Sequence, residues 1–171
     1  EHQDRVEYRG KPVKPASGKI YLAINKPPGY ICSASTSQGK SVLELVDIQE
    51  RIYPVGRLDK DSTGLLLLTN DGEFANKISH PRHGAEKEYL VLLDKKFQPA
   101  DSLKLAAGMM LDGKKLQPIK TAAINGLKIK LILHEGVNRE IRRLLGRLGY
   151  RVINLTRIRI GRLSLGRLKT G

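Results

Sequence analysis

The chain has 171 residues, 40% of them hydrophobic and 28% charged, which indicates a folded globular domain and excludes a disordered chain. Its apolar runs are far shorter than the roughly 20 residues of a membrane span, so no membrane partner is expected. The formal net charge of +14 predicts a polyanionic partner, and the single Cys32 favours a reducing, cytoplasmic location.

The N-terminal third mixes short strands with turns. Residues 1–18 are polar and interrupted by glycine and proline, which is typical of a linker. An apolar strand is predicted over 20–24, followed by a Pro-Pro-Gly turn and a second short strand. A short helix is predicted in 41–47 and an extended segment in 53–58.

Four consecutive leucines, 65–68, indicate a fully buried strand in the middle of the chain. After it, Asn70 or Asp71 is expected to cap a short helix that Pro81 follows. The sequence EKEYLVLL (86–93) then predicts another strand.

The remaining elements complete a mixed pattern. They are a helix in 99–109, hairpin turns at Asp112-Gly113 and Asn125-Gly126, a helix in 138–149 with Asn138 as its N-cap, and a β-branched strand in 151–161. Hairpins without strict strand-helix alternation predict an α+β fold around a mixed, mostly antiparallel sheet.

Basic residues are concentrated toward the C-terminus. Nine arginines and one lysine lie between residues 137 and 171, against one acid, Glu140. The planar guanidinium group pairs phosphate bidentately, so this density favours nucleic acid over a merely solvated surface.

The sequence offers few candidates for chemistry. No metal site is predicted, because His80 and His83 flank a proline in a loop and one cysteine gives no ligand-spaced cluster. Among the acids, Asp61 and Asp71 are interpreted as turn or cap residues. Asp59 differs, since it lies between an extended segment and a buried strand. Its spacing from Arg57 leaves two roles open for Asp59, that of a nucleophile and that of a partner in a structural salt bridge.

Four motifs, in order and spacing, resemble the bacterial rRNA pseudouridine synthases of the RsuA/RluB type. They are NKPPG (25–29), GRLDKDSTGLLLLTNDG (56–72), KEYLV (87–91) and EGVNREIRRL followed by GYRVINLTRIRIG (135–161). The resemblance implies a catalytic domain over 19–171, with helices flanking the sheet and a central basic cleft. Residues 4–14 resemble the end of the small RNA-binding domain with which family members usually begin. Residues 1–18 are therefore expected to be a linker or a remnant of that domain.

The family resemblance also implies an activity. Uridine in ribosomal RNA is isomerised by cleavage of the glycosidic bond, rotation of the base and rejoining through carbon 5, with no cofactor and no metal. The motif in 56–81 looks closer to the large-subunit (23S) enzymes than to the 16S enzymes. Such chemistry requires the nucleotide to be flipped out of a helix. The expected partner is ribosomal RNA, free or in an assembly intermediate, and the expected state is a monomer.

Three residues carry the implied catalysis. The resemblance makes Asp59 the nucleophile or base and places Tyr89 against the target base for proton transfer. On the helical wheel of the predicted C-terminal helix, Arg142 lies at the border of the apolar face and Arg143 nearly opposite it. We therefore expect Arg142 to pair with Asp59, and Arg139 and Arg143 to bind phosphates.

The remaining assignments concern the surroundings of Asp59. The resemblance implies that Leu155 packs on the other face of the base, that Arg57 fills the gap left by the extruded nucleotide, and that Lys26 braces the catalytic loop indirectly. Two alternatives stay open. One is a non-catalytic RNA-binding or ribosome-assembly module with the same fold, and the other is a metal-dependent nuclease using Asp59 and Asp61.

Overall fold

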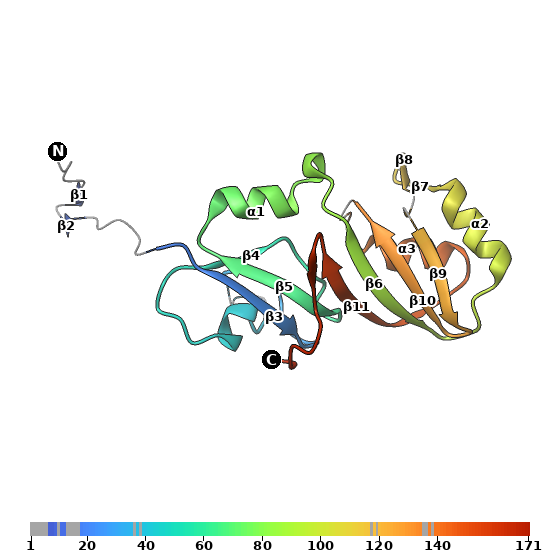
Figure 1. Ribbon diagram of the computed structural model, residues 1–171, viewed down its shortest axis with the longest axis horizontal. Helices are drawn as coiled ribbons and strands as arrows, with labels where there is room; N and C mark the ends of the chain where they lie inside the picture. The colour runs from blue at the N-terminus through green and yellow to red at the C-terminus, as the bar shows by residue number, and fades with distance from the viewer. Residues whose placement is uncertain are drawn as a thin grey trace.

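The computed structural model describes residues 7–9, 11–12, 18–35, 37, 39–116, 118, 120–134, 137 and 139–171. One eight-stranded sheet dominates it, built from β3 (Tyr21–Lys26), β4 (Tyr53–Val55), β5 (Thr63–Thr69), β6 (Lys87–Leu93), β9 (Lys120–Asn125), β10 (Lys128–Leu133), β11 (Val152–Ile160) and β12 (Leu163–Ser164). The main strand order is β3–β5–β11–β6–β10–β9, so β11, which comes late in the chain, lies in the middle (Figure 1). β4 also pairs with β5, and β12 with β11.

The remaining elements are helices and two smaller strand pairs. They are β1 (Glu7–Tyr8) with β2 (Lys11–Pro12), η1 (Val42–Leu45), α1 (Gly72–Ser79), η2 (Pro81–His83), α2 (Pro99–Ala107), β7 (Met109–Leu111) with β8 (Lys114–Leu116), and α3 (Glu140–Arg147). Neighbouring strands of the large sheet are antiparallel, apart from the parallel pair β5–β11. The predicted α+β fold with a mixed, mostly antiparallel sheet is thereby confirmed.

Strand β5 is buried on both faces, which explains its unbroken leucines. Successive side chains of a strand point to opposite faces of the sheet. Leu66 and Leu68 belong to the main core, whereas Leu65 and Leu67 belong to a second core onto which Phe74 of α1 packs. Because both faces are covered, β5 is a rigid anchor for the loop that precedes it.

Helix α3 packs against the main core. Ile141, Leu144 and Leu145 are buried there, at the spacing that places them on one side of a helix. The residue before the helix, Arg139, has the left-handed φ of 49°, which is uncommon for a side chain other than glycine. Arg139 is the N-cap of α3 and makes no side-chain cap hydrogen bond, whereas Asn138, the predicted N-cap, lies outside the described residues.

The N-cap of α1 is Asp71, one of the two residues that the sequence predicted for this position. Asp71 Oδ1 accepts hydrogen bonds from the backbone N–H groups of Glu73 and Phe74. Its Oδ2 accepts one from Tyr21 Oη at 2.7 Å and lies 2.9 Å from Lys19 Nζ. The hydrogen bonds from Tyr21, Lys19 and the helix backbone hold the pKa of this carboxyl well below its usual range.

One predicted strand is wrong. After the Pro-Pro-Gly turn, Ile31 makes only an isolated bridge to Ser41, because Ser41 begins η1 as its N-cap instead of extending a ladder. The hairpin prediction at Asp112-Gly113 is confirmed, and these residues have φ values of 51° and 76°, as a tight turn of this kind needs.

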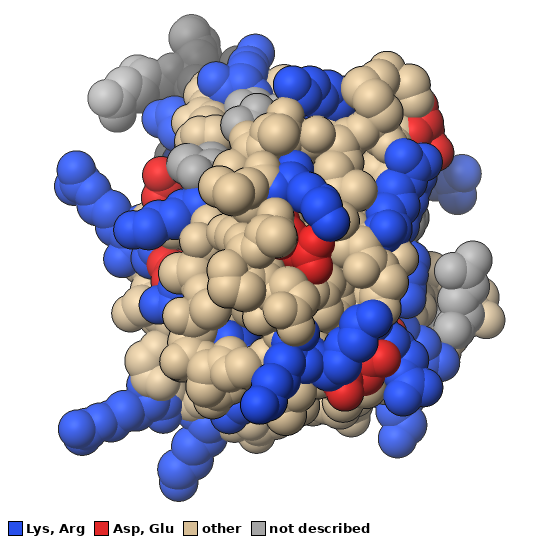
Figure 2. Space-filling view, turned by 90° about the vertical axis from the view of Figure 1, so that its right-hand side faces the viewer, with Lys and Arg blue, Asp and Glu red and all other residues tan. Residues whose placement is uncertain are grey.

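Lys and Arg side chains far outnumber acids on the face at the α2 and β9 end of the molecule, where they are spread across the surface (Figure 2). A surface of this sign attracts polyanions. Within the part of the chain that the structure describes, no helix is long and apolar enough to cross a membrane.

Candidate active site

The loop between β4 and β5 carries Asp59. The Asp59 carbonyl accepts a hydrogen bond from Ser62 N at 3.0 Å, and Leu58 N donates to Cys32 Sγ at 3.3 Å. Gly29 N donates to Lys60 O at 2.7 Å, which ties the Pro-Pro-Gly turn to the same loop. The loop is therefore fixed at both ends by strands and along its length by the segment 26–32.

Lys26 is the innermost of these braces. It ends β3 and is fully buried, with 0% of its surface exposed. Its Nζ donates to the carbonyl oxygens of Ser62 at 2.7 Å, Pro27 at 3.0 Å and Lys60 at 3.3 Å. Burial lowers the pKa of this ammonium group. All three Nζ donors bind backbone carbonyl groups, so Lys26 stabilises the conformation of the loop that carries Asp59.

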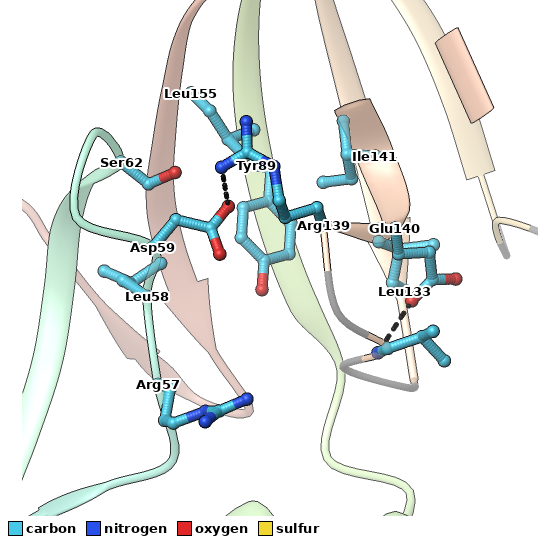
Figure 3. A pocket seen from close by; sticks show the side chains of 11 residues that line it. Arg57, Leu58, Asp59, Ser62, Tyr89, Leu133, Arg139, Glu140, Ile141 and Leu155 are labelled. Carbon is cyan, nitrogen blue, oxygen red and sulfur yellow. Dashed lines mark hydrogen bonds and ion pairs between the residues drawn. The ribbon is translucent and has the colours of Figure 1, made fainter. Parts of the chain in front are cut away.

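Asp59 points from this loop into a cavity of about 80 Å³ at the centre of the sheet (Figure 3). The cavity is lined by Arg57, Leu58, Asp59, Ser62, Tyr89, Leu133, Val137, Arg139, Glu140, Ile141 and Leu155. The Asp59 side chain is 28% exposed, which leaves the carboxylate accessible but constrained. A carboxylate placed this way can attack an electrophilic carbon or accept a proton from a bound group.

The aromatic and aliphatic walls of the cavity come from the two central strands. Tyr89 of β6 is 8% exposed and Leu155 of β11 is 5% exposed. In Figure 3 the Tyr89 ring lies between the Asp59 loop and the N-terminal end of α3, with Leu155 above it. The structure thus brings the predicted residues Asp59, Tyr89 and Leu155 into one cavity.

Two arginines face the carboxylates of the loop. Arg139 Nη1 lies 3.5 Å from Asp59 Oδ2 and 3.4 Å from Asp61 Oδ1. Arg142 Nη2 lies 3.0 Å from Asp61 Oδ2, whereas its Nε lies 3.8 Å from Asp59 Oδ2. Arg142 Nε is buried and has no hydrogen-bond partner within the described residues. Asp59 therefore shares both arginines with Asp61, a partner that the sequence pattern did not indicate.

The other predicted arginines lie outside this ion-pair group. Arg143 Nη2 pairs with Asp112 Oδ1 at 2.6 Å on the surface. Arg57 lines the cavity, but its guanidinium group lies apart from the Asp59 carboxylate (Figure 3). Of the three predicted helix-end arginines, Arg139 and Arg142 approach the catalytic candidate and Arg143 does not.

A buried arginine behind the cavity was not among the predicted site residues. Arg157 on β11 is 3% exposed, and its Nε donates to Leu65 O at 2.8 Å. A side chain on Gly64 would place its Cβ 2.3 Å from Arg157 O, so only glycine permits this close approach of β5 to β11. A glycine inside a leucine-rich strand was the one signal in the sequence for this contact.

The donors around Asp59 suit an anionic partner better than a cation. No cluster of three or more His, Cys, Asp or Glu side chains suited to a metal occurs in the described ranges. Asp59 and Asp61, the pair considered for a nuclease, both face Arg139 and Arg142. Guanidinium groups at these oxygens occupy the positions that a divalent ion would need.

Comparison with known proteins gives one family. The family described as RNA pseudouridylate synthase matches residues 20–146. An uncharacterised RNA pseudouridine synthase of Aquifex aeolicus is 41% identical, over 98% of this chain and 70% of that protein. The ribosomal large subunit pseudouridine synthase B of Bacillus subtilis is 40% identical, over 98% and 72%. The ribosomal small subunit pseudouridine synthase A of Salmonella typhimurium is 35% identical, over 94% and 71%.

Solved structures agree with these relatives. A crystal structure of a pseudouridylate synthase superimposes with a TM-score of 0.85 at 29% identity, over 99% of this chain and 75% of that one. An H/ACA ribonucleoprotein bound to a substrate RNA gives a TM-score of 0.61 at 17% identity, over 88% and 50%, which is a likeness of fold alone. Because the family match spans most of the chain and these relatives cover nearly all of it, this protein belongs to the RNA pseudouridylate synthase family of isomerases.

Proposed function

We propose that this protein converts a specific uridine of ribosomal RNA into pseudouridine, with large-subunit RNA as the favoured substrate. The observation that carries the proposal is the Asp59 carboxylate in a cavity walled by Tyr89 and Leu155. The names of the Bacillus subtilis and Salmonella typhimurium relatives support ribosomal RNA as the substrate. The resemblance of the stretch 56–81 to the large-subunit enzymes supports the large-subunit preference.

The reaction needs one accessible carboxylate and a sheltered base. The target nucleotide is flipped out of its helix, which costs a few kcal/mol, and its uracil enters between Tyr89 and Leu155. Asp59 acts as nucleophile or base while the N1–C1′ bond breaks. The uracil turns, the C5–C1′ bond forms, and the hydrogen leaves C5 while N1 regains a proton. Tyr89 is placed for proton transfer.

The basic residues have separate roles in this proposal. Arg142 pairs with Asp59, and its present 3.8 Å separation shortens when substrate excludes water from the cavity. Arg139 and Arg143 bind phosphates, which offsets part of the cost of flipping. Arg57 fills the gap that the extruded nucleotide leaves. Lys26 supports the loop through its backbone hydrogen bonds.

The domain limits, the location in the cell and the oligomeric state are also part of the proposal. We propose that 19–171 is the catalytic domain, that residues 1–18 are a linker or the remnant of an RNA-binding domain, and that the protein is a cytoplasmic monomer. Size-exclusion chromatography with light scattering measures the oligomeric state directly.

The test uses ribosomal RNA labelled with tritium at carbon 5 of uridine, because forming the new bond at C5 releases that hydrogen. We expect wild-type protein, in its full-length form, to release label and Asp59→Asn to release none above background. Binding of the RNA without release by the wild type would identify a binding module instead of an enzyme. Full release by Asp59→Asn would refute the mechanism while leaving the activity in place.

A further inference from the structure

A second cavity adjoins the first. Its volume is about 260 Å³, and it shares Tyr89 and Arg57 with the cavity that contains Asp59. Lys87 and Arg157 add two more cationic side chains to its wall. Apolar side chains and Ser79 complete the lining, and among the residues that the structure describes no Asp or Glu belongs to it. Three cations around one space favour an anionic occupant.

Arg157 is the most deeply buried of these cations. Its Nε donates to Leu65 O at 2.8 Å and its Nη1 to Arg57 O at 3.3 Å. Its Nη2 is buried and has no hydrogen-bond partner among the residues that the structure describes. A buried charged donor without an acceptor is unfavourable, so an anionic acceptor beside Arg157 Nη2 would be stabilising.

Lys87 also has one donor without a partner among the described residues. It is 8% exposed, and its Nζ donates to His134 O at 2.9 Å and Ala85 O at 3.1 Å. An ammonium group has three donors, so one remains. Burial lowers the pKa of Lys87, and the charge of Arg157 lowers it further, while Glu140 acts in the opposite direction. An anion near Lys87 and Arg157 would relieve both effects.

We propose that the cavity bounded by Arg57, Lys87 and Arg157 is a phosphate subsite that takes a backbone phosphate of the RNA next to the flipped uridine. The identity of the phosphate as part of RNA rests on the proposed function. Because Tyr89 and Arg57 belong to both cavities, a phosphate held here positions the RNA strand against the base-binding cavity. A charge-assisted bond to phosphate is also stronger in this sheltered place than on the surface.

The first experiment uses inorganic phosphate as the probe and isothermal titration calorimetry as the readout, with sodium chloride keeping ionic strength constant. We expect Lys87→Met to weaken phosphate binding at least about tenfold, since a single charge-assisted bond contributes on the order of 1.5–3 kcal/mol. Lys87→Arg retains the charge and should bind phosphate more tightly than Lys87→Met. Lys120→Met, the same change on the exposed edge strand β9, is the matched control. Equal phosphate affinity of the wild type and Lys87→Met overturns the subsite.

A second measurement does not depend on any variant folding. Crystals of the wild-type protein are soaked in selenate, whose selenium is located by anomalous scattering. A selenate within hydrogen-bond distance of Lys87 Nζ or Arg157 Nη2 supports the subsite. Selenate bound only near Arg139 and Arg142, or nowhere, contradicts it.

RNA binding separates this proposal from the proposed function. In titrations of ribosomal RNA fragments at several salt concentrations, loss of one phosphate contact reduces the magnitude of the negative slope of log K against log salt by roughly 0.7–0.9. We expect that reduction for Lys87→Met and not for Lys87→Arg. Phosphate binding that depends on Lys87, with an unchanged slope, would overturn the assignment to RNA. If the slope changes but the wild type releases no tritium, the subsite stands and the isomerase proposal fails.

Discussion

Arg142 holds Asp61 more closely than Asp59, with Nη2 3.0 Å from Asp61 Oδ2 and Nε 3.8 Å from Asp59 Oδ2. Asp61 is half exposed, at 52%, whereas Asp59 is 28% exposed. Arg142 therefore pairs closely with the exposed carboxylate of Asp61, whereas its contact with the more sheltered carboxylate of Asp59 is longer. Such loose geometry without substrate is common for groups that tighten in the reacting complex.

This arrangement predicts a difference between two neighbouring Asp→Asn changes. Asp61→Asn removes a charge that orients Arg142, so we expect the rate of tritium release to fall by less than about tenfold. Asp59→Asn should lower it by at least about a thousandfold, as loss of a nucleophile does in other enzymes. Both are measured at saturating RNA. Equal losses would place Asp61 in the chemistry beside Asp59.

The two adjacent arginines of α3 provide a second comparison. The Arg142 side chain is 12% exposed between two carboxylates, whereas Arg143 pairs at the surface with Asp112. We expect Arg142→Gln to lower kcat about a hundredfold or more while RNA affinity stays nearly unchanged. Arg143→Gln should leave kcat unchanged and weaken RNA binding at low salt. Single-turnover rates and binding titrations distinguish the two, and the reverse pattern would contradict the geometry.

Lys26 predicts an effect on stability. Lys26→Met keeps most of the length of the side chain but removes its hydrogen bonds to three backbone carbonyl groups, of which the one to Ser62 O is buried and the other two are partly buried. Because leaving a buried polar group unsatisfied costs about 1–3 kcal/mol, we expect the free energy of unfolding to fall by about 1–3 kcal/mol. Urea denaturation measures it. Lys60→Met, on the exposed part of the same loop, is the control and should change stability little.

Gly64 predicts a backbone effect with an internal control. A Cβ at Gly64 would lie 2.3 Å from Arg157 O, and its φ is +104°, so Gly64→Ala should destabilise the protein by about 3 kcal/mol or more. For Gly146, inside α3, no atom of the described residues outside the helix backbone lies within 4 Å of the Cβ position. Gly146→Ala should instead stabilise the protein by about 0.5–1 kcal/mol, because alanine is the better helix former. Thermal unfolding of both variants decides the sign.

The capping carboxylate Asp71 predicts a pH dependence. Its pKa in the folded protein lies below the ordinary value of 3.8, so its contribution to stability is complete above about pH 4 and is lost as the pH falls through the folded-state pKa. Asp71→Asn does not titrate. We expect the variant to be less stable near neutral pH and the difference from wild type to shrink below about pH 4. Urea midpoints at a series of pH values test this, and a constant difference would contradict it.

The sequence determined the features that depend on local pattern. The leucine run predicted a strand buried on both faces, and the spacing of apolar residues placed Arg142 at the border of the helix. Asp112-Gly113 predicted a hairpin because its φ values require such residues. Each of these follows from periodicity or turn chemistry within a short window of residues.

Tertiary structure alone decided which side chains meet. Arg139 and Asp61 are 78 residues apart in sequence. A helical wheel describes one helix only, so it could not show that Asp59 shares Arg139 and Arg142 with Asp61. The approach of Gly64 to Arg157 likewise depends on the parallel pairing of β5 with β11, whose register is set across the whole sheet. Local pattern fixes the direction in which a side chain points, but packing of distant strands fixes its partner, because only folding brings such residues within the few ångströms over which ion pairs and hydrogen bonds act.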